Sequence, residues 1–247
     1  MSYRHGILMA VVFAFFQGGF PFLGAMLGAA FRDMIASVDH WVAFGMLLAV
    51  GGKMVYDALC EAGCEEQVYI VGDKQEQIRD VLGEGVAYVF QEKRLGTGHA
   101  VMQAEPFLEE RGGYVIVLPG DCPMVSATTI AKALTHMEQG DDAAVVITAS
   151  ADVPTGYGRV VRDENGNVLR IVEHRDCNEE ELKIKEINSS MYVFKTSLLT
   201  SALGRLSAEN AQKEYYLTDT IDILIKDGGV VGSVICDFED TLGVNDR

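Results

Sequence analysis

Short apolar runs alternate with polar or amphipathic segments from about residue 58 to the end of the chain. Runs such as Gln67–Val71, Val86–Phe90 and Tyr114–Leu118 are nearly continuous in apolar residues, which predicts strands covered on both faces. The segments between them predict helices, and Ser126 is a typical N-cap for a helix that runs to about Gln139. We therefore expect a Rossmann-like α/β domain, with a parallel sheet between two layers of helices.

The alternation of helices and strands continues to the end of the chain, and the strands become shorter beyond Thr155. Four further helices are predicted at Lys74–Leu82, His99–Glu109, Ser197–Leu206 and Tyr216–Lys226. Five further strands are predicted at Ala143–Thr148, Arg159–Arg162, Val168–Glu173, Ile187–Phe194 and Val230–Cys236. The polar, Gly-containing segment Asp163–Asn167 predicts a hairpin turn between the second and third of these strands.

The first 57 residues differ in composition, because they contain long uncharged, apolar segments. No formal charge occurs in the 25 residues from Ile7 to Phe31, and about 20 apolar residues cross a bilayer. A second uncharged run, His40–Gly52, has 13 residues and reaches that length only if the chain up to Tyr56 is counted. A signal peptide and a buried soluble hairpin are alternatives. We favour a transmembrane helical hairpin over residues 7–56, so residues 1–57 and 58–247 form the two expected domains.

Charge follows the same division. Residues 1–58 contain three basic and three acidic side chains, so the remainder carries the whole net charge of −16. A chain of this charge does not bind nucleic acid non-specifically.

The five cysteines form no C-x-x-C pair, which favours a reducing compartment over a zinc site. Arg4 and Lys53 flank the hairpin on one side, so the positive-inside rule places both of its ends in the cytoplasm and predicts that the domain after residue 58 is cytoplasmic and tethered to the inner membrane.

Three loops follow predicted strands, at the position where open α/β sheets bind ligands. In the segment 91–99, Gly96 and Gly98 let backbone N–H groups approach a ligand, although an ordinary strand-to-helix turn would look the same. Asp121 follows a buried strand and is either a ligand for a hard cation or a helix cap. The loop Pro154–Arg159 is either a plain turn or the wall of a pocket.

Seven motifs in register carry a resemblance to a known family. They are QEKRLGTGHA (91–100), LPGDCP (118–123), PTGYGR (154–159), IVEHRD (171–176), EINS (186–189), NAQKEYYLTD (210–219) and GVNDR (243–247). From about residue 58 the chain resembles the uridylyltransferase domain of the bifunctional N-acetylglucosamine-1-phosphate uridylyltransferase / glucosamine-1-phosphate acetyltransferase family. The resemblance implies a nucleotide-diphospho-sugar transferase fold. The implied reaction joins UTP and N-acetylglucosamine-1-phosphate to give UDP-N-acetylglucosamine and pyrophosphate, a step towards cell-wall polymers.

The resemblance also implies roles for individual residues. Uracil would be read by Gln91, Gly96 and Thr97. The catalytic Mg²⁺ would be held by Asp121 and Asn245.

Three further residues match the positions that hold the N-acetylglucosamine moiety: Gly158, Glu173 and Asn188. No covalent nucleophile is implied, because the sugar phosphate itself attacks the α-phosphorus and the protein supplies positioning and electrostatics.

The sequence departs from this family at several points. The family's first strand and its Gly-rich loop, L-x-x-G-x-G-T-R-M, have no match in residues 1–58, so we expect impaired catalysis. The β-helical acetyltransferase domain is not present in the 247 residues. Ser190 stands where the family has Gly, and we expect its side chain to crowd the sugar site.

Residues 5–58 carry a second resemblance. The runs FFQGGFPFLGAMLGAAF and DHWVAFGMLLAVGGKMVYDAL resemble two membrane helices of the manganese efflux pump family. Two helices cannot build the polar pathway that ion transport requires. The alternatives to an enzyme are therefore a fragment of an exporter-like membrane protein, or a non-functional fusion of two unrelated halves.

Overall fold

The computed structural model describes residues 51–64, 66–72, 75–108 and 112–243. The predicted membrane segment Ile7–Phe31 and the predicted metal ligand Asn245 lie outside these residues. All of the described residues belong to one compact unit, which begins at Leu48.

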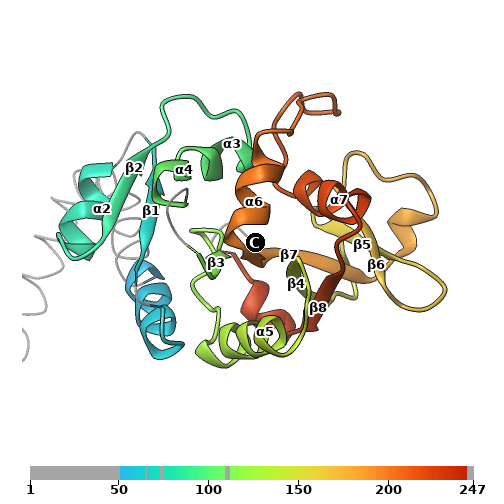
Figure 1. Ribbon diagram of the computed structural model, residues 1–247, viewed down its shortest axis with the longest axis horizontal. Helices are drawn as coiled ribbons and strands as arrows, with labels where there is room; N and C mark the ends of the chain where they lie inside the picture. The colour runs from blue at the N-terminus through green and yellow to red at the C-terminus, as the bar shows by residue number, and fades with distance from the viewer. Residues whose placement is uncertain (1–50, 65, 73–74, 109–111, 244–247) are drawn as a thin grey trace, which may run out of the picture. The chain divides into compact units, whose positions relative to one another are not determined.

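A helix over residues 51–61 comes first, and eight strands and six further α-helices follow it among the described residues (Figure 1). The strands are β1 (Val68–Val71), β2 (Ala87–Phe90), β3 (Tyr114–Val117), β4 (Ala144–Ser150), β5 (Gly158–Arg162), β6 (Val168–Val172), β7 (Glu186–Lys195) and β8 (Val231–Ile235). The helices are α2 (Gln75–Leu82), α3 (Thr97–Met102), α4 (Glu105–Leu108), α5 (Ala127–Gln139), α6 (Thr196–Leu203) and α7 (Asp219–Lys226).

Six strands form the larger sheet, in the order β6-β5-β7-β4-β8, with β3 also paired to β7. Strand β7 runs antiparallel to β3, β4 and β5, whereas β4 and β8 are parallel. The prediction of a parallel sheet is therefore wrong in this half, and the sheet is mixed. For β5 and β6 the reason is local, because the tight turn Asp163–Asn167 joins them and such a turn only connects antiparallel neighbours.

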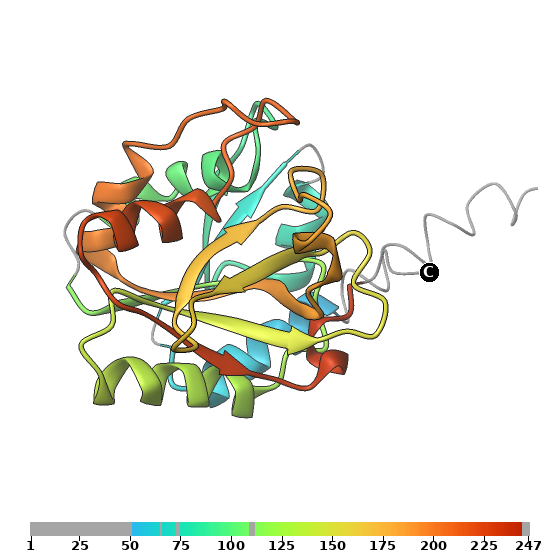
Figure 2. The same cartoon turned by 90° about the vertical axis from the view of Figure 1, so that its right-hand side faces the viewer.

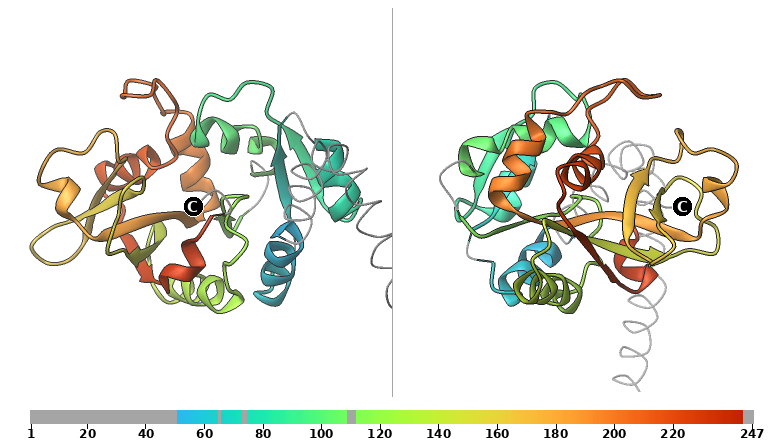
Figure 3. Two further views of the ribbon diagram at one scale, coloured as in Figure 1. Left: turned by 180° about the vertical axis from the view of Figure 1, so that it is seen from behind. Right: turned by 45° about the vertical axis from the view of Figure 1, so that its right-hand side comes forward.

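The smaller sheet contains β1 and β2, which are parallel and connected through α2. Its strands are mostly half-buried, and only Val71 of β1 is buried. Figures 1 and 3 show this sheet beside the larger one, and Ile70 of β1 packs against the core on one face of the larger sheet. Among the described residues, no strand pairing joins the two sheets.

Helices cover both faces of the larger sheet, as the sequence predicts (Figure 2). One face packs against α3, α6 and α7 through buried residues that include Leu199, Leu203 and Ile221. The other face packs against α5 and the helix over residues 51–61, through Ile130 and Met137 among others. The sheet is thus the centre of a three-layer α/β domain.

The predicted helix His99–Glu109 is observed as two short helices, α3 and α4. Pro106 explains the break, because proline has no N–H to donate to the carbonyl of the preceding turn and is tolerated in the first turn of a new helix. The N-cap prediction at Ser126 is confirmed, since its hydroxyl accepts a hydrogen bond from the Thr129 N–H at 3.2 Å. Helix α7 begins at Asp219 rather than Tyr216.

The helix over residues 51–61 belongs to this domain. Val55 and Ala58 are buried in the core beside α5, and the helix ends in a left-handed glycine, Gly63, with φ of 84°. The prediction that a membrane span continues to Tyr56 is therefore wrong, because Val55 packs inside the α/β domain. In the part of the chain that the structure describes, no helix has the length and apolarity to cross a membrane.

Candidate functional site

Gln91 follows the last residue of β2 and faces the loop that precedes α3. Its backbone N–H donates to the Val71 carbonyl at 2.8 Å, which extends the β1–β2 ladder by one residue. Its side-chain amide lies 3.0 Å from His99 Nδ1 and 3.4 Å from the Gly96 carbonyl oxygen. The sheet edge thus presents the amide to the same loop that the sequence singled out.

Gly96 is a glycine for two physical reasons. Its φ of 112° lies in the region that side chains avoid. A Cβ at this position would also lie 2.5 Å from the Tyr215 carbonyl oxygen. The close approach is part of a mutual docking, in which the Gly98 N–H donates to the Tyr215 carbonyl and the Tyr215 N–H donates to the Leu95 carbonyl, each at 2.8 Å.

Thr97 takes part in the same docking. Its hydroxyl accepts a hydrogen bond from the Leu217 N–H at 3.0 Å, so the predicted uracil residues are held by a segment more than a hundred positions later in the chain. Figures 1 and 3 show this segment, between α6 and α7, beside α3. Sequence reasoning assigned no role to Tyr215 or Leu217, although both lie in one of the motifs.

Glu173 lies just after β6 at the opposite end of that docked segment. Its carboxylate accepts a hydrogen bond from the Thr218 hydroxyl at 3.2 Å. Burial raises the pKa of Glu173 above its usual range, and the negative charges of Asp219 and Asp176 act in the same direction. A half-buried carboxylate with few donors is suited to accept hydrogen bonds from hydroxyl or amide groups of a ligand.

Gly158 and Asn188 are brought together, as the resemblance implies. They are partners across the β5–β7 pairing, and a Cβ on Gly158 would meet the Asn188 Cβ at 3.4 Å. Asn188 is buried and donates to the Tyr192 hydroxyl at 2.6 Å. The amide is therefore fixed in orientation by the sheet beneath it.

Ser190 follows in the same strand, and its backbone explains why glycine suits the position. It has a φ of 62° and lies at an irregularity of the β4–β7 pairing. Its side chain is exposed. The structure thus adds a backbone cost at Ser190, where the sequence led us to expect crowding of the sugar site.

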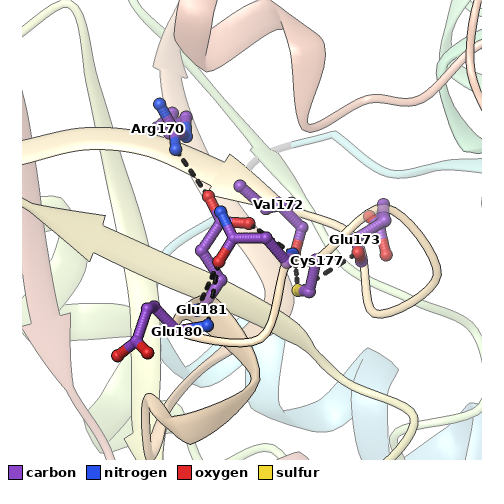
Figure 4. Close-up of polar contacts among 7 residues, drawn as sticks. Arg170, Val172, Glu173, Cys177, Glu180 and Glu181 are labelled. Atoms are coloured by element: carbon purple, nitrogen blue, oxygen red, sulfur yellow. Dashed lines mark hydrogen bonds and ion pairs between the residues drawn. The ribbon is translucent and has the colours of Figure 1, made fainter.

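Hydrogen bonds within the chain brace the loop that carries Glu173 (Figure 4). The Cys177 thiol donates to the Glu173 carbonyl oxygen at 3.4 Å and to the Val172 carbonyl oxygen at 3.6 Å. Glu181 accepts from the Asn178 N–H at 2.8 Å and from Arg170 on β6. The loop is held to the sheet at both ends, which keeps Glu173 at a defined position.

Asp121 lies on the surface in the turn after β3, at the end of the strand as predicted. An exposed carboxylate in such a turn has the oxygen chemistry that Mg²⁺ prefers. Among the described residues no cluster of three or more metal-ligating side chains exists, and the second predicted ligand, Asn245, is outside them. The described residues therefore supply one of the two expected protein ligands.

One segment connects the two groups of residues. Residues 215–217 dock on the loop 95–98, while Asp176 accepts from the Ala211 N–H at 3.0 Å and from the Tyr216 hydroxyl at 3.3 Å. Thr218 also donates a hydrogen bond to Glu173. Residues 210–218 therefore form a bridge between the loop that follows β2 and the loop that follows β6. The arrangement suits a ligand with two different ends.

The family of the chain follows from comparison with known proteins. The model of the nucleotidyl transferase family matches residues 46–241. The chain belongs to the nucleotidyl transferase family. It has the α/β fold of nucleotidyltransferases, and the predicted fold class is confirmed to that extent.

Curated relatives share long stretches of this sequence. The bifunctional protein GlmU of Acetivibrio thermocellus is 47% identical over 226 residues, which is 91% of this chain and 48% of the relative. The GlmU protein of Geobacillus thermodenitrificans is 46% identical over the same length. The chain thus spans about half the length of these relatives, and a match over 226 residues reaches back into the first fifty residues of the chain.

Solved structures agree on the fold. A UDP-glucose pyrophosphorylase in complex with UDP-glucose superposes with a TM-score of 0.60 at 15% identity, covering 75% of this chain and 78% of that one. A glucose-1-phosphate thymidylyltransferase from Bacillus anthracis gives a TM-score of 0.59 at 16% identity. At these identities the likeness concerns the fold alone.

Proposed function

We propose that the chain binds UTP and N-acetylglucosamine-1-phosphate and belongs to an enzyme that forms UDP-N-acetylglucosamine. The observation that carries the proposal is the bridge 210–218, which joins the loop of Gly96 to the loop of Glu173. A nucleotide-sugar has two chemically distinct ends, and the two loops offer them different partners. The identity of 46–47% to GlmU proteins supports the choice of this substrate pair.

At the nucleotide end, Gln91, Gly96 and Thr97 read the uracil edge in this proposal. An amide side chain and nearby backbone groups offer both donors and acceptors, as a pyrimidine edge requires. At the sugar end, Glu173 and Asn188 accept and donate hydrogen bonds to hydroxyl and acetamido groups, and Gly158 lies beside Asn188 on the neighbouring strand.

The proposed metal is Mg²⁺, held by Asp121 and Asn245. Mg²⁺ keeps most of its octahedral positions for water and phosphate oxygens, so two protein ligands suffice. When bound, the ion supplies neutralisation of charge on the phosphates. The chain's own contribution is to hold the sugar phosphate and the nucleotide in line.

Calorimetry tests the proposed ligand. UDP-N-acetylglucosamine should bind more tightly than the corresponding ADP- or GDP-sugar, and Gln91→Ala should weaken it by ~1–3 kcal/mol because the uracil edge loses a hydrogen-bond partner. Gln139→Ala, at the exposed end of α5, is the matched control and should leave the affinity unchanged. Equal affinity for UDP- and ADP-sugars would overturn the assignment.

We further propose that turnover is slow. The Gly-rich loop of the family has no recognisable counterpart in residues 1–58, and cations on the transferring group are worth ~10³–10⁵ in phosphoryl transfer. Pyrophosphate release from UTP, N-acetylglucosamine-1-phosphate and Mg²⁺ should therefore be at least ~10⁴-fold slower than in an intact relative. Fast turnover that is abolished in Asp121→Ala would mean that a segment of the first fifty residues replaces the loop.

The proposed membrane tether has a separate test. The uncharged segment Ile7–Phe31 supports it, so the full chain should fractionate with membranes while residues 48–247 should not. The truncation keeps the helix over residues 51–61, because Val55 and Ala58 belong to the core. Recovery of the full chain as monodisperse protein without detergent would exclude the tether.

A further inference from the structure

Arg159 is the largest side chain that is fully buried in the described part of the structure, with 1% of its surface exposed. It lies on β5 opposite Val172 of β6 and Ile187 of β7. Among the described residues, no carboxylate forms an ion pair with it, and its Nε has no hydrogen-bond partner. A buried cation without a counter-charge is costly and therefore uncommon.

Arg162, three residues further along β5, is a useful comparison because its charge is compensated by a carboxylate. Its guanidinium pairs with the Glu186 carboxylate, donates to the Gly166 carbonyl oxygen at 2.8 Å and donates to the Ser233 hydroxyl at 2.9 Å. Its charge is neutralised, and its role is to connect strands. Arg159 makes no comparable ion pair.

The contacts that Arg159 does make are with two loops. Its Nη1 donates to the Tyr157 carbonyl oxygen, and its Nη2 lies 3.5 Å from His174 Nδ1. Tyr157 immediately precedes Gly158, and His174 immediately follows Glu173. One planar guanidinium therefore spans the two loops that carry the proposed sugar residues, and its rigid fork fixes both contacts together.

An apolar side chain of similar volume would fill the same space without the cost of burying a charge. What only a guanidinium supplies at this position is the pair of contacts to the loops. A hydrogen bond from Nη2 to this ring would use the lone pair of His174 Nδ1, which the tautomer with its proton on Nε2 offers. The burial of the cation is thus tied to the geometry of the loops rather than to the sheet.

We propose that Arg159 is a positioning residue for sugar recognition, which sets the spacing between Gly158 and Glu173. The inference rests on the proposed function and deepens it. The hydrogen bonds of Arg159 go to Tyr157 and His174, whereas the described residues 91–97 contact one another and residues 215–217, so the nucleotide end is independent of Arg159. Loss of the guanidinium should therefore weaken the sugar-bearing ligand and spare the nucleotide alone.

The experiment compares two ligands on matched variants of the full chain. UDP-N-acetylglucosamine and UDP are titrated by calorimetry into the wild-type protein, Arg159→Met and Arg162→Met, and the unfolding midpoint of each is recorded. For Arg159→Met we expect about tenfold weaker binding of UDP-N-acetylglucosamine, which corresponds to ~1.4 kcal/mol, and unchanged binding of UDP. Arg162→Met should lower stability but leave both affinities unchanged.

Two further variants keep the proposal testable if Arg159→Met does not fold. Arg159→Lys keeps the charge without the fork, and His174→Leu removes one contact from a half-buried loop position. Both should weaken UDP-N-acetylglucosamine selectively and by less than Arg159→Met. An equal loss for UDP and UDP-N-acetylglucosamine, or no loss for either, would overturn the positioning role. Failure of the wild-type chain to bind UDP-N-acetylglucosamine would instead overturn the proposed function, and this inference with it.

Discussion

The two sheets differ in burial although their strands read alike in the sequence. Strand β1 has the sequence VYIV and is half-buried apart from Val71, whereas β4, AVVITAS, has six consecutive buried residues. Strand β4 lies between β7 and β8 and is covered on both faces by helices. Strand β1 has only β2 as a partner among the described strands.

The difference separates the two ends of the proposed site. Gln91 is attached to the smaller sheet, while Glu173 and Asn188 are attached to the larger one. Local stability follows the number of buried contacts around an element, so we expect the nucleotide end to open more easily than the sugar end. The bridge 210–218 is then the element that holds the less stable end against the more stable one.

The largest expected effect comes from truncating the core of each sheet. Ile147→Ala, at a fully buried position of β4, should lower the free energy of unfolding by ~3–4 kcal/mol. Ile70→Ala, at a half-buried position of β1, should cost only ~1–2 kcal/mol because less apolar surface returns to water. Urea denaturation measures both, and equal losses would show that the two sheets are equally well packed.

Native-state hydrogen exchange tests the difference without mutation. The Gln91 amide donates to Val71 in the smaller sheet, and the Lys195 amide donates to Ala143 in the larger one. We expect the free energy of opening at Gln91 to be smaller by ~2 kcal/mol or more. Opening of both amides with the same free energy would mean that the domain unfolds as a single unit.

The stability of the domain should depend on pH through Asp219, the first residue of helix α7. Burial and the charges of Asp222 and Asp176 raise the pKa of Asp219 from 3.8 to about 6. A carboxyl group with a raised pKa in the folded state stabilises the protein at low pH, and that stability is lost as the pH rises through about 6.

Asp219→Asn should therefore remove this pH dependence and raise stability at pH 7 by ~1 kcal/mol, after allowance for its half-exposed position. The contrasting variant is Asp227→Asn, at an exposed carboxylate whose pKa Arg205 lowers, for which the pH dependence should have the opposite sign. Thermal unfolding between roughly pH 4 and pH 8 measures both. A flat difference between wild type and Asp219→Asn would contradict the prediction.

The smallest effect concerns a strained residue within the more stable sheet. Ser190→Gly relieves a left-handed backbone conformation but adds chain entropy to the unfolded state, so the net gain should be ~0.5 kcal/mol. Ser189→Gly, next to it and buried, is the control and should destabilise, because the Ser189 hydroxyl donates to the Ile147 carbonyl oxygen at 2.6 Å. A loss of stability in Ser190→Gly would show that the serine side chain contributes more than the strain costs.

Much of the site was accessible from local sequence. Gly96 is a glycine because of its positive φ and its close approach to Tyr215, and such a constraint leaves a local signature. The positions of Gln91, Asp121 and Glu173 at strand ends follow from the alternation of strands and helices. The contacts of Tyr215 and Leu217 with the loop 95–98 had no such signal, since they depend on how distant segments meet.

The sequence by itself determined the order of helices and strands, the N-cap at Ser126 and the motifs of a nucleotidyltransferase, because these depend on periodicity and on the local preferences of the backbone. Only the tertiary structure decided that β7 runs antiparallel, that Val55 belongs to the core, and that Arg159 is buried between two loops without a carboxylate. These features depend on which segments become neighbours, and burial, pairing direction and charge compensation are properties of neighbours rather than of single segments.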